Sequence, residues 1–565
     1  TVSSSVPMLA AALHEKINFL LQLAALSTDN AAHADLQCAP ELFEELWWLL
    51  RLVGHVVADD GRGETPMRPL QFDENEQTRI ALRQIGELFI GTLCVQMCEN
   101  QSVKQFLSPR VVEQVVWCAA RWADTHLFPE DSGGRVRNVL LNDNNLSING
   151  SVQSPDPFEG EGGAYAAKIL VGLATVAISF YDGETSLRKS ASFRLLPSLT
   201  RRNAPCKAVA NDPAWTTLLF STGQAHENVN GGFPSEIFCG LTESLARAAI
   251  GIAEENDQRI TYLRYVIEPP SKVLLLAIEN KKFIEHPTGE SRTMGALEAL
   301  RGVARASLSK RHEFSTNHFF EMLSPLTRVI ENAISANSSL VISRAMKLSE
   351  TLCEIFAMDE ENTDRQQRIR EFTLSIVSIF AKSEPTKMTT ATLTRLRDEE
   401  IKANYKCLKS LLRALTHLAS AWNDEDKEKL ASVVFSGLAV VIPLLTPDAL
   451  LLPKLRNCYF SLLSYSMESF ADIIVKNANR MSELVVNING SAAGASDPNA
   501  LFFMILSTLE FGLDNDDENV CRESLVALGA LAAAELRKQK NGGGGGGGAA
   551  TDSPLLMQTT QTVAS

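Results

Sequence analysis

The sequence predicts an all-α protein, an α-solenoid in which antiparallel helix pairs stack side by side. Apolar residues recur at steps of three and four along most of the chain, which is the period of a helix with one buried face. Helix starts made of a capping residue followed by proline also recur, and alternating patterns of strand length are absent. With 565 residues, the chain is too long for a single hydrophobic core. We therefore expect a stacked array that forms a superhelix.

The stretch from Gly437 to Phe470 shows the expected repeat unit most clearly. Its apolar run, Val433–Leu452, is long enough to span a bilayer, but Pro443 and Pro447 divide it into short pieces. A second helix follows Pro453, with one apolar and one polar face. The apolar positions are Leu455, Tyr459, Leu462, Ser466, Phe470 and Ile473, and the polar ones are Asn457, Ser461, Ser464, Glu468 and Asp472.

We divide the chain into residues 1–128 (helical repeats), 129–163 (a mobile insertion), 164–540 (helical repeats) and 541–565 (a glycine-rich, disordered tail). In the first region, helices are expected at Met8–Leu26, from Pro40, at Glu74–Glu99 and from Pro109, with Ser108 as its cap. The helix that begins so soon after Thr1 suggests that the chain is part of a longer one. The insertion is rich in Gly, Asn, Ser, Asp and Pro and has no apolar period.

The second helical region predicts a series of helices with short polar joints. They are Tyr165–Tyr181, Thr185–Leu199, Pro213–Ser221, Pro234–Glu254, Asp257–Asn280, Met294–Leu308, Asn317–Ile334, Ser338–Phe356, Asp364–Phe380, Thr392–Trp422, Lys427–Leu445, Pro453–Ile474, Pro498–Leu513 and Asn519–Arg537. Pro269-Pro270 should break the fifth of these helices. Leu323-Ser324-Pro325 repeats the chemistry of a helix start, as does Asp212-Pro213.

Charge and cysteine content restrict the partners and the compartment. The 53 basic residues against 67 acidic ones give a net charge of −14, which disfavours nucleic acid and anionic membrane and favours a basic protein partner. The ten cysteines are scattered, without a secretory signal or an uninterrupted apolar span, so we expect a reduced, intracellular protein that does not insert into membranes. Cys94 and Cys98 lie one helical turn apart, but no second ligand pair lies near them in sequence.

No catalytic pattern stands out, so we expect no catalytic residues, no metal site, no cofactor and no enzymatic activity. A nucleophile elbow, a Walker loop, a paired-histidine metalloprotease helix and a dinucleotide fingerprint are all missing from the sequence. The nine histidines are dispersed. A hydrolase remains an alternative only if a histidine and a carboxylate converge in one closed pocket.

Several segments resemble the exportin-4 family in order along the chain. The matching residues include Trp48-Leu49, Gly54, Ala58-Asp59-Asp60, Gly63-Glu64-Thr65-Pro66, Val116-Trp117, Arg121-Trp122-Ala123, Ile442-Pro443-Leu444, Pro453, Tyr459, Leu509-Glu510, Gly512-Leu513, Val520-Cys521 and Thr551-Asp552-Ser553-Pro554-Leu555. The matches are sparse between Tyr165 and Ala421.

The resemblance implies HEAT repeats of the importin-β (karyopherin) superfamily, here its C-terminal half. It implies a monomeric receptor that shuttles between nucleus and cytoplasm, carries protein cargo through nuclear pores and contacts pore proteins. Loading would be controlled by Ran-GTP, bound mainly through repeats that this chain lacks. Family cargoes include the hypusine-bearing translation factor 5A and a Smad protein. The main alternative is a HEAT scaffold subunit of a signalling complex, which would bind its partner regardless of the nucleotide state of Ran.

Glu468 and Asp472 are the candidate cargo-facing residues. They lie four residues apart on the polar face of one helix, where like charges are slightly destabilising. One interpretation is an ordinary solvated surface. The functional interpretation is an acidic concave wall that attracts a lysine-rich or hypusine-bearing surface, with an effect mainly on association rate and salt dependence.

Overall fold

A computed structural model describes most of the chain in fourteen longer stretches. They are residues 2–27, 39–58, 75–128, 160–181, 183–210, 212–227, 233–252, 256–309, 312–357, 363–383, 389–395, 397–421, 427–477 and 500–542. The chain divides into two compact units, and each is described by itself. Unit 1 comprises Thr1–Val273 with Glu298–Ser315, and unit 2 comprises Leu274–Leu297 with Thr316–Ser565.

The described residues form helices and contain no β-strand, so the all-α prediction is confirmed. Two elements, η3 and η5, are π-helical, and η7 and η8 are 3₁₀ turns. The first elements are α1 Val2–Leu26, α2 Ala39–Val57, α3 Glu76–Gly86, η3 Glu87–Cys94, α4 Val95–Glu99, α5 Gln101–Phe106, α6 Pro109–His126, α8 Gly160–Ser179, α9 Thr185–Ser190, η5 Ala191–Leu195, α10 Leu196–Thr200, α11 Asn203–Ala210, α12 Pro213–Glu227 and α13 Ser235–Ile252. The remaining ones are α14 Asn256–Glu279, α15 Lys281–Glu285, α16 Pro287–Ser309, α17 Glu313–Ser335, α18 Ser339–Ala357, α19 Thr363–Lys382, α20 Thr390–Leu393, α21 Glu399–Ala419, α22 Lys427–Val441, η7 Ile442–Leu444, η8 Ala449–Leu451, α23 Pro453–Lys476, α25 Ala500–Leu513 and α26 Glu518–Gly542.

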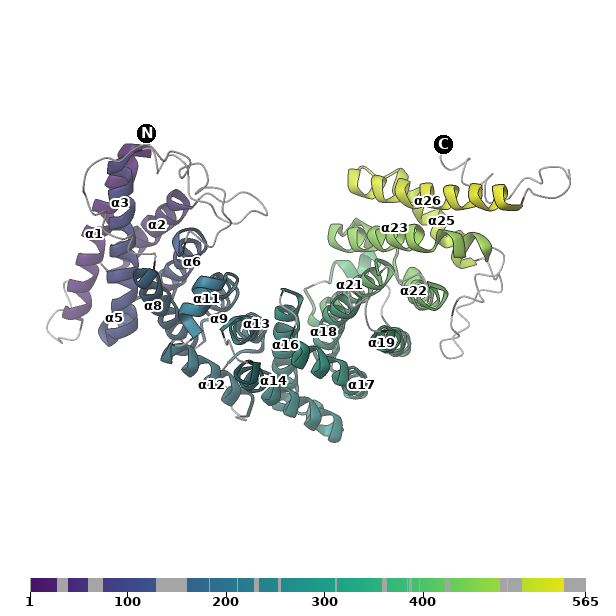
Figure 1. The fold of residues 1–565 in the computed structure, drawn as a ribbon, viewed down its shortest axis with the longest axis horizontal. Helices are drawn as coiled ribbons and strands as arrows, with labels where there is room; N and C mark the ends of the chain where they lie inside the picture. The colour runs from purple at the N-terminus through teal and green to yellow at the C-terminus, as the bar shows by residue number, and fades with distance from the viewer. Residues whose placement is uncertain are drawn as a thin grey trace. The chain divides into compact units, whose positions relative to one another are not determined.

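The helices of unit 1 are arranged in two layers (Figure 1). In one layer α2 packs against α6, α6 against η5, and η5 and α10 against α13. In the other layer α1 packs against α3, and α8 lies against α4, α11 and α12. The apolar core fills the space between the layers and includes Leu46, Trp122 and Leu196, all buried. Each helix therefore buries one side against its own layer and another against the opposite layer.

Unit 2 repeats this arrangement with fewer interruptions (Figure 1). In one layer α18 packs against α21, α21 against α23 and α23 against α26, and in the other α19 packs against α22. On α23, the predicted apolar positions are all buried: Leu455, Tyr459, Leu462, Ser466, Phe470 and Ile473. Ser464, expected on the polar face, is buried as well, so that expectation is wrong.

The ends of several helices are capped by side chains of the next helix in the stack. Arg121 of α6 donates from Nε to the Gly54 carbonyl, 2.9 Å away, and from Nη2 to the Ala58 carbonyl, 2.6 Å away, at the end of α2. Ser469 of α23 donates to the Ala419 carbonyl at the end of α21. These carbonyls have no partner within their own helix, so a cap from the neighbouring helix both satisfies them and fixes the spacing of the stack.

Two of the predicted helix starts are confirmed in detail. Ser108 is the N-cap of α6 and its hydroxyl accepts from the Val111 amide, with Pro109 in the first turn. The Asp212 carboxylate accepts from the Ala214 amide, 2.8 Å away, at the start of α12. At Thr446 the hydroxyl accepts from the Ala449 amide but opens only the short turn η8.

Three expected boundaries are wrong. Helix α14 continues through Pro269 and Pro270, and Pro325 lies inside α17 rather than at a helix start. Both helices bury apolar residues close to the prolines, for example Ile267 and Leu326, so tertiary packing outweighs the lost backbone hydrogen bonds.

The third wrong boundary is the single helix expected at Thr392–Trp422. It is instead the short α20 and a longer α21 that begins at Glu399. The described residues between them, 394, 395, 397 and 398, are all exposed, so burial gives no support to a continuous helix.

Most of the predicted insertion and tail lies outside the described residues. Helix α8 begins at Gly160, so residues 160–163 belong to a helix, while 129–159 are not described. Helix α26 extends to Gly542, two residues into the predicted tail, and 543–565 are not described. The division into residues 1–128, 129–163, 164–540 and 541–565 stays a prediction.

Candidate functional site

The two predicted cargo-facing carboxylates are both exposed, one turn apart on α23. Asp472 accepts from Arg537 of α26, with Oδ1 lying 2.9 Å from Nη2 and 3.2 Å from Nε. Glu468 has no ion-pair partner among the described residues. Folding thus accounts for Asp472, which ties α23 to α26. Sequence reasoning could not predict this pair, because its members are 65 residues apart.

Charges of both signs pair along the layer formed by α18, α21 and α23. Glu350 of α18 pairs with Arg413 of α21, with Oε1 and Nη1 2.9 Å apart, and Glu354 lies 3.9 Å from His417 on the same two helices. Cys458 of α23 is adjacent to Arg413; burial raises the pKa of its thiol, and Arg413 opposes that shift. Complementary charges on neighbouring helices therefore link the helices of this layer.

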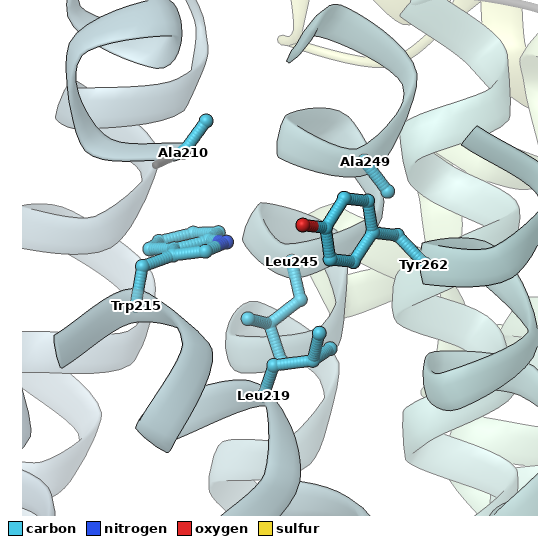
Figure 2. Close-up of a pocket in the computed structure, with 6 residues that line it drawn as sticks. All are labelled: Ala210, Trp215, Leu219, Leu245, Ala249 and Tyr262. Atoms are coloured by element: carbon cyan, nitrogen blue, oxygen red, sulfur yellow. The ribbon is translucent and has the colours of Figure 1, made fainter. Parts of the chain in front are cut away.

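A small apolar pocket lies between α11, α12, α13 and α14, and sequence reasoning missed it (Figure 2). It is lined by Ala210, Trp215, Leu219, Leu245, Ala249 and Tyr262, and has an empty volume of about 210 Å³ that includes open solvent. Pockets for small molecules usually start at about 300 Å³ and carry convergent polar groups. No histidine or carboxylate lines this pocket, so it lacks the machinery for hydrolysis.

Two exposed aromatic residues lie on α12 and α14, two of the four helices that line this pocket. Phe220 of α12 and Tyr265 of α14 are 45% and 46% exposed, and their rings meet edge to face with centroids 5.2 Å apart. These two rings therefore expose apolar surface to solvent on α12 and α14.

The described part of the chain holds no group of three or more residues with metal-binding geometry. Burial raises the pKa of Cys94 well above its ordinary value and that of Cys98 to about 12, and the Cys98 thiol donates to the Ile169 carbonyl. Both residues therefore pack as neutral thiols between α4, η3 and α8. The expected absence of metal, cofactor and enzymatic activity stays a prediction.

Two described helical segments, Glu76–Glu99 and Gly162–Ser179, are long and apolar enough to cross a membrane by length and composition alone. Half of each is buried inside the protein, and both pack in the core of unit 1. Core helices of soluble proteins pass the same test. The prediction that the chain does not insert into membranes remains untested.

Comparison with known proteins identifies the family. The model of the Exportin-4 family matches residues 5–490, which is most of the chain. The chain belongs to the exportin-4 family. This confirms the resemblance seen in the sequence, and with it the importin-β (karyopherin) superfamily and the HEAT-type α-solenoid. In this exportin-4 family chain, α25 and α26 lie beyond the matched residues.

Individual relatives are distant. Exportin-4 of Dictyostelium discoideum is 21% identical over 448 residues, which cover 75% of this chain and 37% of that protein. The exportin-4 family chain thus spans little more than a third of the length of this curated relative. Among solved structures, an importin-β crystallised in ammonium sulfate is 11% identical with a TM-score of 0.41, covering 92% of this chain and 58% of the other. A structure of Kap95p with RanGDP is 13% identical with a TM-score of 0.23, covering 95% and 68%.

Proposed function

We propose that this chain is the cargo-carrying part of a nuclear transport receptor, which shuttles between nucleus and cytoplasm and releases or binds protein cargo under the control of Ran-GTP. The observation that carries the proposal is the match to the exportin-4 family over residues 5–490. The two-layered stacks support it, because each layer leaves one side of its helices free for a protein partner. Ran would be bound mainly by other repeats of the receptor, and pore proteins are the further partners.

We place a cargo contact on α23, around Glu468. This carboxylate is exposed and unpaired among the described residues, while Asp472, one turn away, carries negative charge shared with Arg537. A cargo lysine, or a longer hypusine side chain, would find one free carboxylate and one partly neutralised one. A translation factor 5A-like protein fits this chemistry, whereas a Smad-like cargo would need a basic segment at its surface.

The decisive experiment is capture of cargo from nuclear extract by the full-length receptor, with and without GTP-locked Ran. A transport receptor should change its bound proteins at least several-fold when Ran-GTP is added, because cargo and Ran-GTP binding are coupled. An unchanged set of bound proteins would instead favour a scaffold subunit that is indifferent to Ran.

The contact on α23 has its own test. Glu468→Gln combined with Asp472→Asn should slow cargo association a few-fold at low salt and reduce its salt dependence, because long-range attraction is screened by ions. The matched control is Asp364→Asn with Glu371→Gln, which removes one aspartate and one glutamate from exposed positions of α19 in the opposite layer. Equal association rates for the two double variants would mean that Glu468 and Asp472 are ordinary surface.

A further inference from the structure

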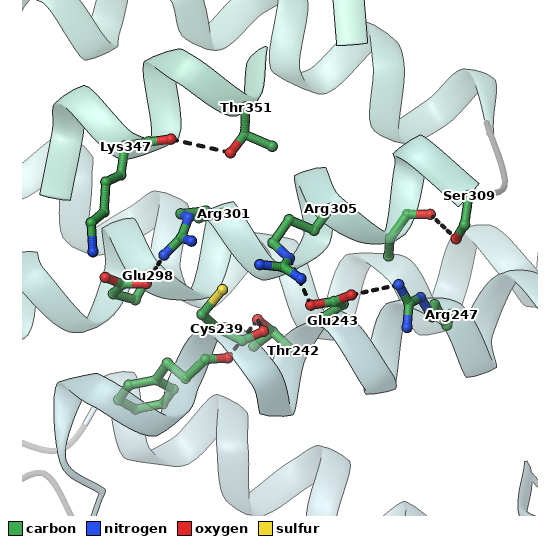
Figure 3. Close-up of polar contacts among 12 residues, drawn as sticks. Cys239, Thr242, Glu243, Arg247, Glu298, Arg301, Arg305, Ser309, Lys347 and Thr351 are labelled. Atoms are coloured by element: carbon green, nitrogen blue, oxygen red, sulfur yellow. Dashed lines mark hydrogen bonds and ion pairs between the residues drawn. The ribbon is translucent and has the colours of Figure 1, made fainter. Parts of the chain in front are cut away.

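A cluster of arginines surrounds one buried carboxylate in unit 1 (Figure 3). Glu243 of α13 is buried, and both of its oxygens are occupied: Oε1 lies 2.5 Å from Arg247 Nη2, and Oε2 lies 2.9 Å from Arg305 Nε of α16. One turn away on α16, Arg301 pairs with the buried Glu298, with Nη1 and Oε2 2.8 Å apart. Both buried carboxylates are thus paired with guanidinium groups.

Arg201, at the end of α10, adds a further positive charge to this cluster. Helix α10 packs directly on α13. Burial lowers the pKa of Arg247, Glu243 opposes this shift, and Arg201 and Arg305 lower the pKa further, so Arg201 and Arg305 each lie within electrostatic reach of Arg247. Arg201 is exposed, and its guanidinium group has no hydrogen-bond or ion-pair partner among the described residues.

The cluster is rich in positive charge although the whole chain is acidic. Arg247, Arg301 and Arg305 pair with the two carboxylates of Glu243 and Glu298, and Arg201 adds a fourth guanidinium group within electrostatic reach of Arg247. These six groups carry a surplus of two positive charges. A surplus at one place in a chain of net charge −14 is not needed for solubility. Repulsion between arginines also opposes folding, so folding alone does not explain why Arg201 is placed here.

The supporting helices hold the arginines in place. At Gly302, α16 approaches α13 so closely that an added Cβ would lie 2.2 Å from the Cys239 carbonyl oxygen. The Thr242 hydroxyl donates to the Ala299 carbonyl, 2.7 Å away, across the same contact. The ion pairs with Glu243 already restrict the side chains of Arg247 and Arg305. Binding of a ligand would therefore cost little further side-chain entropy at these two residues.

We propose that Arg201, Arg247 and Arg305 form a docking site for an acidic segment of a protein partner, one rich in aspartate and glutamate. Guanidinium groups bind carboxylates through paired hydrogen bonds, and this planar fork suits carboxylates better than an ammonium group does. Arg201 supplies a guanidinium group that has no partner among the described residues. The Arg305 side chain pairs with Glu243 but is 43% exposed, so part of it stays accessible to a partner. The site is opposite in charge to the contact on α23 and does not depend on control by Ran-GTP.

The test uses the full 565-residue chain and a fluorescein-labelled oligoglutamate peptide, with binding followed by fluorescence anisotropy. Arg201→Gln should weaken binding about threefold and Arg201→Gln with Arg305→Gln about tenfold, each with a shallower salt dependence. The matched control, Lys168→Gln with Lys207→Gln, removes two exposed positive charges from α8 and α11 of the same unit and should leave the affinity unchanged. The Arg201 side chain has no partner among the described residues, so Arg201→Gln separates binding from folding if the double variant is unstable.

Three results would overturn the proposal. The first is that the unmodified chain, Arg201→Gln and the double arginine variant all bind the peptide with the same affinity. The second is an equal loss in the lysine control, which would show attraction by overall charge. The third is tighter binding of an oligouridylate than of the peptide, lost in the same arginine variants, which would assign the site to nucleic acid.

Discussion

Gly302 shows how a single missing side chain sets the distance between two helices. Its backbone lies against α13, and an added Cβ would meet the Cys239 carbonyl oxygen and the Thr242 hydroxyl oxygen, each at 2.2 Å. Gly529 of α26 is the opposite case, because an added Cβ there meets no atom within 4 Å. The two glycines have similar helical surroundings in sequence, and only the tertiary contacts distinguish them.

Substitution of these glycines should have effects of opposite sign. Gly302→Ala should destabilise unit 1 by about 1–3 kcal/mol, because the helices must separate to admit the methyl group. Gly529→Ala should stabilise α26 by about 0.5–1 kcal/mol, because alanine loses less backbone entropy in a helix. Denaturant unfolding followed by circular dichroism measures both, and a neutral Gly302→Ala would show that the α13–α16 contact is loose.

His417 should make the protein sensitive to mild acid. Burial lowers the pKa of its imidazole from the ordinary 6.5, Glu354 and Glu350 oppose this shift, and Arg413 adds to it. The folded protein therefore binds this proton less tightly than the unfolded chain does. Its stability is unaffected well above pH 6.5 and decreases as the pH falls through 6.5 toward the lowered pKa.

Replacement of His417 by glutamine should remove this part of the pH dependence. Thermal melts from pH 8 to about pH 5.5 should show a smaller decrease in melting temperature for His417→Gln than for the unmodified chain. His14→Gln, at an exposed position of α1, is the control and should follow the unmodified chain. Identical curves of melting temperature against pH for all three proteins would mean that protonation of His417 does not destabilise the folded protein.

Among the elements, the helix ends depend on side chains from the next helix of the stack. Arg121 is buried and bonds to two carbonyls at the end of α2, while the His126 ring bonds to a third, at Val57, over 2.7 Å. The same device recurs in unit 2, where Lys538 of α26 donates to the Val475 carbonyl of α23. Such caps link each helix to its neighbour by directional contacts as well as by apolar packing.

Loss of one such cap should cost more than loss of an ordinary surface charge. Arg121→Met keeps much of the apolar stem but leaves the Gly54 and Ala58 carbonyls without this donor, so we expect a loss of about 2–3 kcal/mol. Arg110→Met, at an exposed position of the same helix, should change the stability by less than about 0.5 kcal/mol. The free energy of unfolding in urea is the measurement, and similar values for the two variants would rule out a capping role.

For the whole molecule, the division into two compact units predicts local rather than global responses to damage. In stacked repeats each helix pair contacts only its neighbours, so a perturbation weakens with distance along the array. In Arg121→Met, hydrogen exchange should accelerate in α2 and α6, while α21, α23 and α26 of unit 2 should exchange as before. Equal acceleration in both units, measured by mass spectrometry, would show that the chain unfolds as one cooperative body.

Local patterns in the sequence were enough to predict the fold class, most of the helices and the family. These follow from local information: the helical period of apolar residues, the caps at Ser108 and Asp212, and short segments such as Arg121-Trp122-Ala123 that match in order. It failed at Pro269 and Pro325, where burial on neighbouring helices outweighs the local preference of proline.

The tertiary structure alone decided which side chains meet. Asp472 pairs with Arg537 and Glu243 with Arg305 across more than 60 residues of sequence, and neither pair follows a helical spacing. The same holds for the pocket beside Trp215 and for the free carboxylate of Glu468. Local periodicity fixes which face of a helix is buried, but the partner of each exposed charge depends on which helix the stack places beside it.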